Sequence, residues 1–424
     1  MEKKTFSLKE GIKTHIIETD LFKTNLICLM LTVPITKEDV TKNALIPFLL
    51  KRGTANLKNQ YEINKKLEQM YGAVYDCGID KVGDNQLIKF YIEIVNEKFL
   101  PKKVDILKES IDTVLDIVFN PIMENETFKE EFLETEKNNL RKVIESRIDN
   151  KDKYAYDNCI ASMYEDKGYG IYKYGYIEDL ENINLKDISE HYKKLINTAK
   201  IDIYISGEIE EENIKHILEN NENIQKLNDR EENFILSAKF KEGKEKTEVN
   251  IIEEKMNISQ GKLVMGLDVF SKQENLQIIG LVYNSILGDG ANSMMFQNVR
   301  EKASLAYSAK SGYIKQKNNI FIRCGIEIEN YEKAVDIIKE QLKNIEDGKF
   351  TNEDIENAKN YLISSIKSID TEQDTQIVYY IGQELSKTDY TTDQYIEKIQ
   401  RVSKEEIEEF AKTVKLNTIY FLRN

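Results

Sequence analysis

The segment FQNVREKASLAYSAKSGY runs from Phe296 to Tyr313 and follows a loop of small residues, Gly288–Asn292. It carries Arg300 and Tyr307, which stand seven positions apart. Seven residues span about two turns of an α-helix, so one possibility is that both side chains share a helix face. The alternation that begins at Tyr307 instead favours a helix that ends early and a strand that Tyr307 opens. We therefore predict that this polar pair lies at a helix-to-strand junction.

The length and composition of the whole chain indicate a globular protein with more than one domain. It has 424 residues, which is more than one hydrophobic core usually serves. Hydrophobic residues make up 41% and charged residues 32%, whereas disordered chains lack the apolar share. The net charge of −14 argues against a nucleic-acid partner, which calls for a basic face. It weakly favours basic ligands through electrostatic steering.

The sequence also lacks signals for a membrane or for secretion. No apolar run approaches the roughly 20 residues that a membrane span needs. The N-terminal stretch MEKKTFSLKEGIK has no apolar segment of the kind that a signal peptide carries. The four cysteines are isolated, which is typical of buried, reduced thiols: Cys28, Cys77, Cys159 and Cys324. We therefore expect a cytoplasmic protein without a membrane partner.

The sequence that follows the opening segment belongs to an internal repeat. Gly325–Ile328 leads into ENYEKAVDIIKEQ, and Tyr91–Ile94 leads into the similar VNEKFLPKKVDILKES. A second pair matches in the same order, YIEDLENINLKDISEHY from Tyr176 and YIEKIQRVSKEEIEEF from Tyr395. Two ordered matches indicate a duplicated domain of about 200 residues.

Each repeat has the pattern of an α+β unit. The apolar stretch Leu26–Val33 is typical of a central strand, and Leu87–Val95 alternates before a helix is expected. We predict two homologous halves, each a mainly antiparallel sheet packed with helices. The predicted boundaries are an N-terminal domain at 1–222, a polar linker at 223–246 and a C-terminal domain at 247–424.

Three markers occur along the chain: the turn Arg52-Gly53-Thr54, the run Glu136-Lys137 with Asp149-Asn150 downstream, and the opening segment. With these markers the chain resembles the insulinase/pitrilysin family of zinc metallopeptidases, the inverzincins. That segment is similar to the family pattern L-F-x-x-L-R-E-K-x-G-L-A-Y-S, except that Ser304 stands where a Gly is usual. The likeness covers essentially the whole chain and implies the clam-shell half of such a peptidase.

The catalytic part of the likeness fails. Active members carry H-x-x-E-H on a helix before the Gly-Thr turn, and its two His side chains bind zinc while the Glu activates water. Here the two His positions fall on Ala44 and Phe48, and the Glu position falls on Pro47. The third ligand falls on Val143, with Glu145 close by if the alignment slips. Because a catalytic zinc needs three protein ligands, we expect no metal, no cofactor and no catalytic residue in this chain.

The three histidines do not restore a site. His15, His191 and His216 have no i, i+4 spacing, so each is expected to be an ordinary structural or surface residue. The chain also lacks H-E-x-x-H, G-x-S-x-G, P-loop and C-x-x-C motifs. A self-sufficient peptidase would need an unusual metal site, which is the least favoured hypothesis. Its ligands would come from Glu134, Glu136 and Glu145 together with a histidine.

The resemblance assigns a substrate-binding role to Arg300 and Tyr307. In the family, a matching Arg and Tyr hold the peptide and its developing oxyanion at the zinc centre of a facing domain. Both side chains are hydrogen-bond donors that suit carbonyl oxygens. The alternative is that Arg300 pairs with Glu301 and Tyr307 packs in a sheet. The strand LIKFYIEIV or its counterpart IFIRCGIEIE is further expected to expose an edge to which a peptide could be added.

The leading hypothesis is therefore a non-catalytic subunit that pairs with a homologous partner. That partner would carry H-x-x-E-H and the zinc, and the complex would bind a peptide or an unfolded protein. The alternative is a peptide-binding or maturation factor without a peptidase role, for instance in modification of a translation factor or of a ribosomally made peptide. A neighbouring reading frame with H-x-x-E-H would favour the first.

Overall fold

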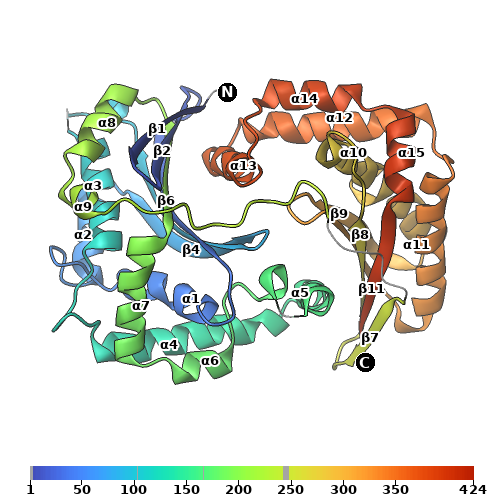
Figure 1. Ribbon diagram of the computed structural model, residues 1–424, viewed down its shortest axis with the longest axis horizontal. Coiled ribbons are helices and arrows are strands. Elements are labelled where there is room, and N and C mark those ends of the chain that lie inside the picture. Colours follow the sequence, from blue (N-terminus) through green and yellow to red (C-terminus); the bar gives the residue numbers. More distant parts are fainter. Residues whose placement is uncertain (1–2, 103, 166, 242–247) are drawn as a thin grey trace. The chain divides into compact units, whose positions relative to one another are not determined.

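The computed structural model describes residues 3–102, 104–165, 167–241 and 248–424 (Figure 1). Its contacts divide the chain into two compact units. Unit 1 comprises Met1–Ser146, Ile171–Ile235 and Ile369–Gly382, and unit 2 comprises Arg147–Gly170, Leu236–Ser368 and Gln383–Asn424. Each unit contains one sheet packed with helices.

The sheet of unit 1 has six strands in the order β1-β2-β6-β3-β5-β4. Only the β2–β6 pair is parallel, and the other neighbours are antiparallel. The strands are β1 (Lys3–Lys9), β2 (Ile12–Glu18), β3 (Thr24–Pro34), β4 (Val74–Val82), β5 (Asn85–Val95) and β6 (Lys200–Gly207).

The sheet of unit 2 has five strands in the order β7-β11-β8-β10-β9. Here only the β7–β11 pair is parallel. The strands are β7 (Asn250–Lys255), β8 (Gly261–Val269), β9 (Ala306–Ile314), β10 (Asn319–Ile326) and β11 (Val414–Arg423). This order and these directions repeat those of β2-β6-β3-β5-β4, so the predicted α+β fold with two homologous halves is confirmed.

The helices follow the strands in the same sequence in both repeats. Those of unit 1 include α1 (Val40–Leu50), α2 (Gln60–Gln69), α3 (Ile106–Phe119), α4 (Glu130–Glu145), α6 (Ile177–Asn182), α7 (Leu185–Thr198), α8 (Glu211–Glu219), α9 (Glu222–Lys226) and most of α13 (Gln373–Leu385). Those of unit 2 include α5 (Lys151–Tyr164), α10 (Leu276–Gly288), the π-helix η4 (Phe296–Lys302), α11 (Tyr331–Glu346), α12 (Asn352–Ile369), α14 (Thr392–Arg401) and α15 (Lys404–Lys412). No helix within the described ranges is long and apolar enough to cross a membrane.

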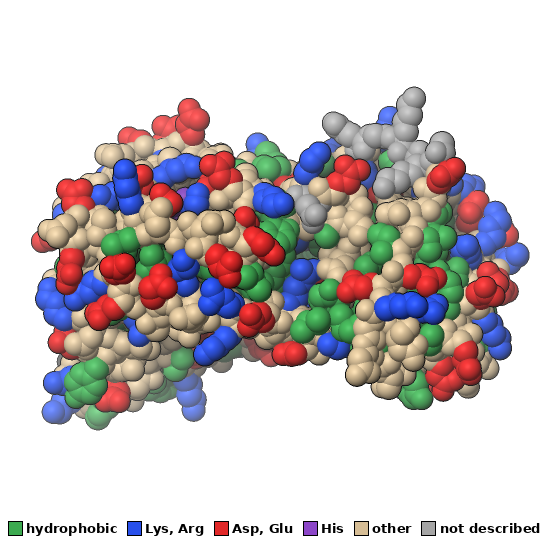
Figure 2. All heavy atoms as spheres, turned by 90° about the horizontal axis from the view of Figure 1, so that it is seen from below, with side chains coloured by type: hydrophobic (Ala, Val, Ile, Leu, Met, Phe, Trp, Pro, Cys, Tyr) green, Lys and Arg blue, Asp and Glu red, His purple; other side chains and the backbone are tan. Residues whose placement is uncertain are grey.

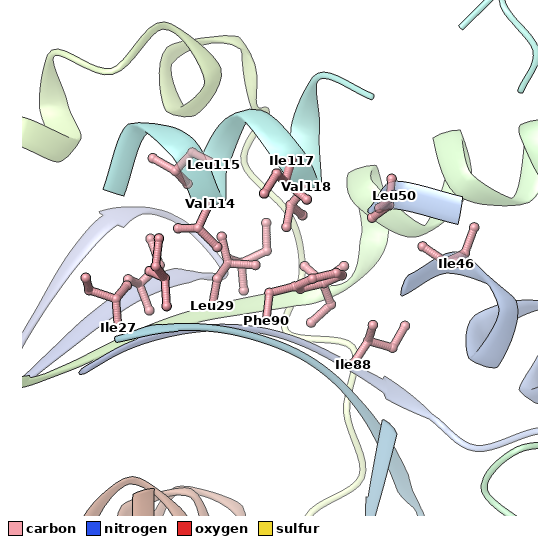
Figure 3. Close-up of a cluster of buried hydrophobic side chains, with 14 of the residues drawn as sticks. Ile27, Leu29, Ile46, Leu50, Ile88, Phe90, Val114, Leu115, Ile117 and Val118 are labelled. Carbon is pink, nitrogen blue, oxygen red and sulfur yellow. The ribbon is translucent and has the colours of Figure 1, made fainter. Parts of the chain in front are cut away.

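The core of unit 1 lies between one face of the sheet and the helices that cover it. Ile27 and Leu29 of β3 and Phe90 of β5 point toward Val114 and Val118 of α3 (Figure 3). All five side chains are buried. Apolar burial contributes about 25 cal/mol for each Å² removed from water, so this layer is a main source of stability.

Each unit also contains a helix from the other repeat. Helix α5, from the N-terminal repeat, packs on β8 and β11 of unit 2, where Met163 closely approaches Gly266. Helix α13, from the C-terminal repeat, belongs mostly to unit 1 and forms hydrogen bonds with its strands. The Gln373 side-chain amide donates to the Ser206 carbonyl over 2.7 Å and accepts from the Thr24 hydroxyl over 2.8 Å. Both helices stand between equivalent neighbours in their repeats, α4 and α6 or α12 and α14. The two repeats therefore exchange one helix.

The sequence-based division at 1–222, 223–246 and 247–424 stays a prediction. The described part of the connecting segment, up to residue 241, runs from unit 1 into unit 2 at Ile235–Leu236. The end of the predicted linker, 242–246, lies outside the described residues.

Candidate functional site

The positions that the resemblance assigns to zinc ligands are apolar and packed. Ala44, Pro47 and Phe48 lie on α1, where Ala44 and Pro47 are buried and Phe48 packs against the core of unit 1. Val143 of α4, which contacts α1, packs against the same core. None of these side chains carries a nitrogen, oxygen or sulfur atom that could bind a metal ion.

The nearby carboxylates do not form a substitute. Glu136 is buried and accepts hydrogen bonds from the Arg52 guanidinium and, over 2.8 Å, from the Asn139 amide. Glu134 and Glu145 are exposed on α4. Among the residues that the structure describes, no group of three or more His, Cys, Asp or Glu side chains could hold a metal ion. The hypothesis of an unusual metal site therefore receives no support.

Two of the three histidines, His15 and His191, have buried rings with hydrogen-bond partners, whereas His216 is exposed. The His15 ring lies 2.9 Å from a buried Asp202 oxygen and 3.0 Å from the Thr5 hydroxyl. Burial raises the pKa of Asp202, but the charge of Lys200 and the His15 ring outweigh this effect and lower it to about 2. His216 is exposed on α8.

His191 supports the helix that has lost the metal motif. Its Nε2 lies 2.7 Å from the Asn43 side-chain oxygen on α1, and its Nδ1 lies 3.5 Å from Asp39. The Asn43 amide in turn donates to the Gln86 side chain over 2.9 Å. Burial lowers the pKa of His191 to about 4, although the Asp39 carboxylate opposes this shift. The ring is therefore neutral near pH 7 and ties α1 to α7 and β5.

Arg300 and Tyr307 lie at the junction that the sequence predicts. Arg300 is in η4 and Tyr307 is the second residue of β9, so the expectation that Tyr307 opens a strand is confirmed. Between them, Ser304 adopts a φ of 52°, the left-handed region that favours glycine. A π-helix is rare and frequently marks a functional site.

Both side chains of this pair are open to solvent. Arg300 lies 4.5 Å from the centre of the Phe296 ring, and its Nε lies 3.6 Å from an oxygen of Glu301. Tyr307 is 69% exposed, and its hydroxyl has no hydrogen-bond partner within the described part of the chain. The alternative interpretation predicted that Arg300 pairs with Glu301 and that Tyr307 packs in a sheet. The ion pair is present, but the Tyr307 side chain is exposed rather than packed. The substrate-binding role of the pair stays a prediction.

The structure corrects the expected sheet edges. LIKFYIEIV is β5, which lies between β3 and β4, and IFIRCGIEIE contributes β10, which lies between β8 and β9. Neither strand is an edge, because each repeat places one more strand outside it. Strand β4 is one edge of the sheet in unit 1, opposite β1, and β9, which carries Tyr307, is its counterpart in unit 2, opposite β7.

A groove beside β4 is a feature that the sequence reasoning missed. It has a volume of about 760 Å³ and lies wholly within unit 1, between the strands β3, β4 and β5 and the start of α13. Its carboxylates outnumber its one described lysine, Lys89: they are Asp76, Asp80, Glu93, Glu372 and Asp374. The polar alternation Lys89-x-Tyr91-x-Glu93 in β5 was the available signal.

Apolar and acidic side chains lie next to each other in this groove. Val74 is 60% and Val378 is 53% exposed. Burial raises the pKa of Asp80, but hydrogen bonds and charges from Lys89 and Lys173 outweigh it and lower the pKa. The remaining carboxylates give the groove a negative character, which suits a basic and partly apolar ligand.

The visible surface elsewhere carries mixed charge. On the face drawn in Figure 2, Lys and Arg side chains are interspersed with Asp and Glu rather than gathered into one basic area. A duplex nucleic acid binds to a continuous basic face, and this face does not offer one.

Comparisons with known proteins identify similar chains. Residues 182–362 match the family described as "Peptidase M16 inactive domain". The chain is 29% identical over 415 residues to a Bacillus subtilis protein named "Probable inactive metalloprotease YmfF", covering 97% of this chain and 96% of that one. It is 23% identical over 268 residues to the "Uncharacterized zinc protease YmxG" of the same bacterium, covering 62% of each.

A solved structure shares the whole fold. The crystal structure of a conserved protein from Enterococcus faecalis V583 superimposes with a TM-score of 0.90 at 24% identity, covering 100% of this chain and 99% of that chain. The similarity in fold therefore extends over both repeats.

Proposed function

We propose, from the premise that this chain is an inactive peptidase-like protein of the insulinase family, that it is the substrate-binding subunit of a two-subunit zinc peptidase. Its partner would be a homologue that carries H-x-x-E-H and the zinc, and the complex would work in the cytoplasm. The relative named as a zinc protease belongs to the same bacterium as the relative named as inactive, so related chains of both kinds occur together.

The observation that carries this proposal is the contrast within one chain. Its metal positions are filled by core side chains, while Arg300 and Tyr307 stay exposed at the open edge of a sheet. An extended peptide that adds to β9 would form backbone hydrogen bonds with that edge. The guanidinium and the phenol would then donate to its carbonyl oxygens and to charge that develops during cleavage by the partner.

The test is to co-purify this chain with a zinc-bearing homologue and to measure kcat/KM for peptide cleavage. Arg300→Ala and Tyr307→Phe should each lower kcat/KM by about 10²–10³-fold, the effect of removing one donor to an oxyanion. Exposed residues of the same type serve as matched controls, Arg401→Ala on α14 and Tyr61→Phe on α2, and should leave the rate unchanged. Unchanged kcat/KM in both test variants would refute the role.

The groove of unit 1 favours a second candidate function. Because it lies beside the edge strand β4 and carries an excess of carboxylates, it could bind a basic peptide without any zinc subunit. The protein would then be a peptide-binding or maturation factor. Fluorescence anisotropy of the chain alone, with a basic peptide and its charge-reversed counterpart, distinguishes the two. Tight binding of the basic peptide, together with failure to join any zinc-bearing homologue, favours the second function.

A further inference from the structure

Unit 2 contains a second pocket, the Lys315 pocket, which lies away from Arg300 and Tyr307 in the sequence and has no role in the proposed peptide site. Its volume is about 320 Å³, within the range of small-molecule sites. Four segments form its walls: 237–239, residues 273–278 at and just before the start of α10, Lys315 just after β9, and 386–395, which leads from the end of α13 into α14. Figure 1 labels α10 and α14.

Hydrogen bonds hold the connecting segment against this pocket. The Ser237 backbone N–H donates to the Leu385 carbonyl over 2.9 Å. The Asn318 side-chain amide donates to the Ala238 carbonyl over 3.3 Å, and Asn318 itself is fully buried. The pocket wall is thus part of the folded unit.

The pocket is basic although the chain as a whole is acidic. Three lysines line it, Lys239, Lys315 and Lys387, against Glu274 as the one carboxylate among the described lining residues. No described carboxylate forms an ion pair with any of these lysines. In a protein with a net charge of −14, three unpaired cations around one pocket need an explanation.

Lys315 is the cation that the fold places deepest. It is half-buried, with its ammonium 5.8 Å from the centre of the Tyr395 ring. Burial lowers the pKa of Lys315 because no anion compensates for the lost water. A partly buried charge without an anionic partner in the described residues costs free energy that a bound anion can recover.

The start of α10 adds partial positive charge to that of the lysines. Its N-cap residue, Asn275, has a left-handed φ of 59° and does not cap the helix with its side chain. Instead, the Asn275 oxygen accepts from the Lys398 ammonium over 3.2 Å. The first N–H groups of a helix carry partial positive charge and bind anions.

We propose that the Lys315 pocket binds the phosphate or carboxylate group of a small molecule. Lys315 supplies the principal charge, the start of α10 supplies hydrogen bonds, and the rings of Tyr390 and Tyr395 contact the rest of the ligand. This binding is independent of peptide cleavage.

The test titrates the full chain by calorimetry with inorganic phosphate and, separately, with acetate at constant ionic strength. We expect saturable binding of one or both anions. The anion that binds more tightly shows whether the pocket prefers a phosphate or a carboxylate group. Lys315→Gln should weaken binding by about tenfold or more, the usual scale for a charge-assisted contact. Lys339→Gln on α11 makes the same charge change at an exposed site and should have no effect.

A second variant keeps the proposal testable if Lys315→Gln does not fold. Glu274 is exposed at the rim of the pocket, so Glu274→Gln should fold normally and tighten binding severalfold by removing a repulsive charge. Absence of saturable binding below about 10 mM in both arms overturns the proposal. Equal affinity of the wild type and Lys315→Gln, or of the wild type and Glu274→Gln, also overturns it.

Discussion

Helix α1 in unit 1 and the segment after α10 in unit 2 differ in what their side chains do. On α1, Ala44, Pro47 and Phe48 are committed to the core. After α10, Arg300 and Tyr307 lie in solvent. The first region contributes to stability and offers no chemistry, and the second offers donors and contributes little to stability. Substitutions in the two regions should therefore have opposite consequences.

The largest expected effect on stability is in α1. Ala44→His puts a polar ring at a position with no exposed surface, so it combines overpacking with the burial of unpaired polar groups. We expect a loss of about 3 kcal/mol in the free energy of unfolding, measured by urea titration followed by circular dichroism. Tyr307→His, at a position 69% exposed, should change it by less than about 0.5 kcal/mol. Equal losses would contradict the comparison.

The two arginines provide a second test. Arg52→Ala leaves the buried Glu136 without its cation, and because Arg52 itself is partly exposed we expect a loss of about 2–3 kcal/mol. Among the described residues Arg300 forms an ion pair only with the exposed Glu301, and it lies over the Phe296 ring, so Arg300→Ala should cost less than about 0.5 kcal/mol. The same urea titration measures both, and a large loss for Arg300→Ala would assign it a structural role.

The pH dependence of the free energy of unfolding should reveal the contribution of His191, whose neutral ring contacts Asn43 of α1. The pKa of His191 is about 4 in the folded protein, against about 6.5 in the unfolded chain. Between these values the unfolded chain binds a proton that the folded protein does not, so stability falls as the pH falls. From pH 7.5 to pH 5 this residue should account for a loss of about 1–2 kcal/mol.

The control for this prediction is the third histidine. Unfolding titrations at the two pH values should show a smaller loss in His191→Gln than in the wild type. His216→Gln, on the exposed face of α8, should behave as the wild type does. If both variants keep the full loss, His191 does not cause it.

The smallest effect is expected at the turn between Arg300 and Tyr307. Ser304 has a φ of 52°, so Ser304→Gly should relieve backbone strain and raise stability by about 0.5 kcal/mol. Ser308→Gly, within β9, should instead lower it by about 0.5–1 kcal/mol, because glycine weakens a strand. A loss of stability in Ser304→Gly would mean that the serine side chain has a role at this turn.

Several features of the fold could be predicted from local residues. The repeated pairs around Ile92 and Ile326 predicted two homologous halves, because a duplicated pattern of strand and helix folds to a duplicated unit. The alternation from Tyr307 predicted the start of β9, since side chains in a strand have a period of two. These signals are contained in neighbouring residues and need no tertiary contact.

Other features depended on contacts between distant residues. The sequence pattern predicted that β5 or β10 is an edge strand, whereas β4 and β9 lie outside them. The alternation of side chains within one strand cannot predict the order of strands in a sheet. The acid groove brings Asp80 and Glu93 together with Asp374, and the Lys315 pocket joins four separate segments. The exchange of α5 and α13 likewise has no local signal.

The sequence by itself determined that the positions matching the zinc ligands of the family hold no metal-binding side chain, since the residue types at 44, 47, 48 and 143 decide this whatever the fold. It also determined the duplication and the place of Arg300 and Tyr307 at a helix-to-strand junction. Only the tertiary structure decided that Tyr307 stands exposed on an edge strand, and that Lys315 is half-buried without an anionic partner in the described part of the chain. Exposure and pairing are properties of neighbours in space, and residues far apart in the chain supply those neighbours.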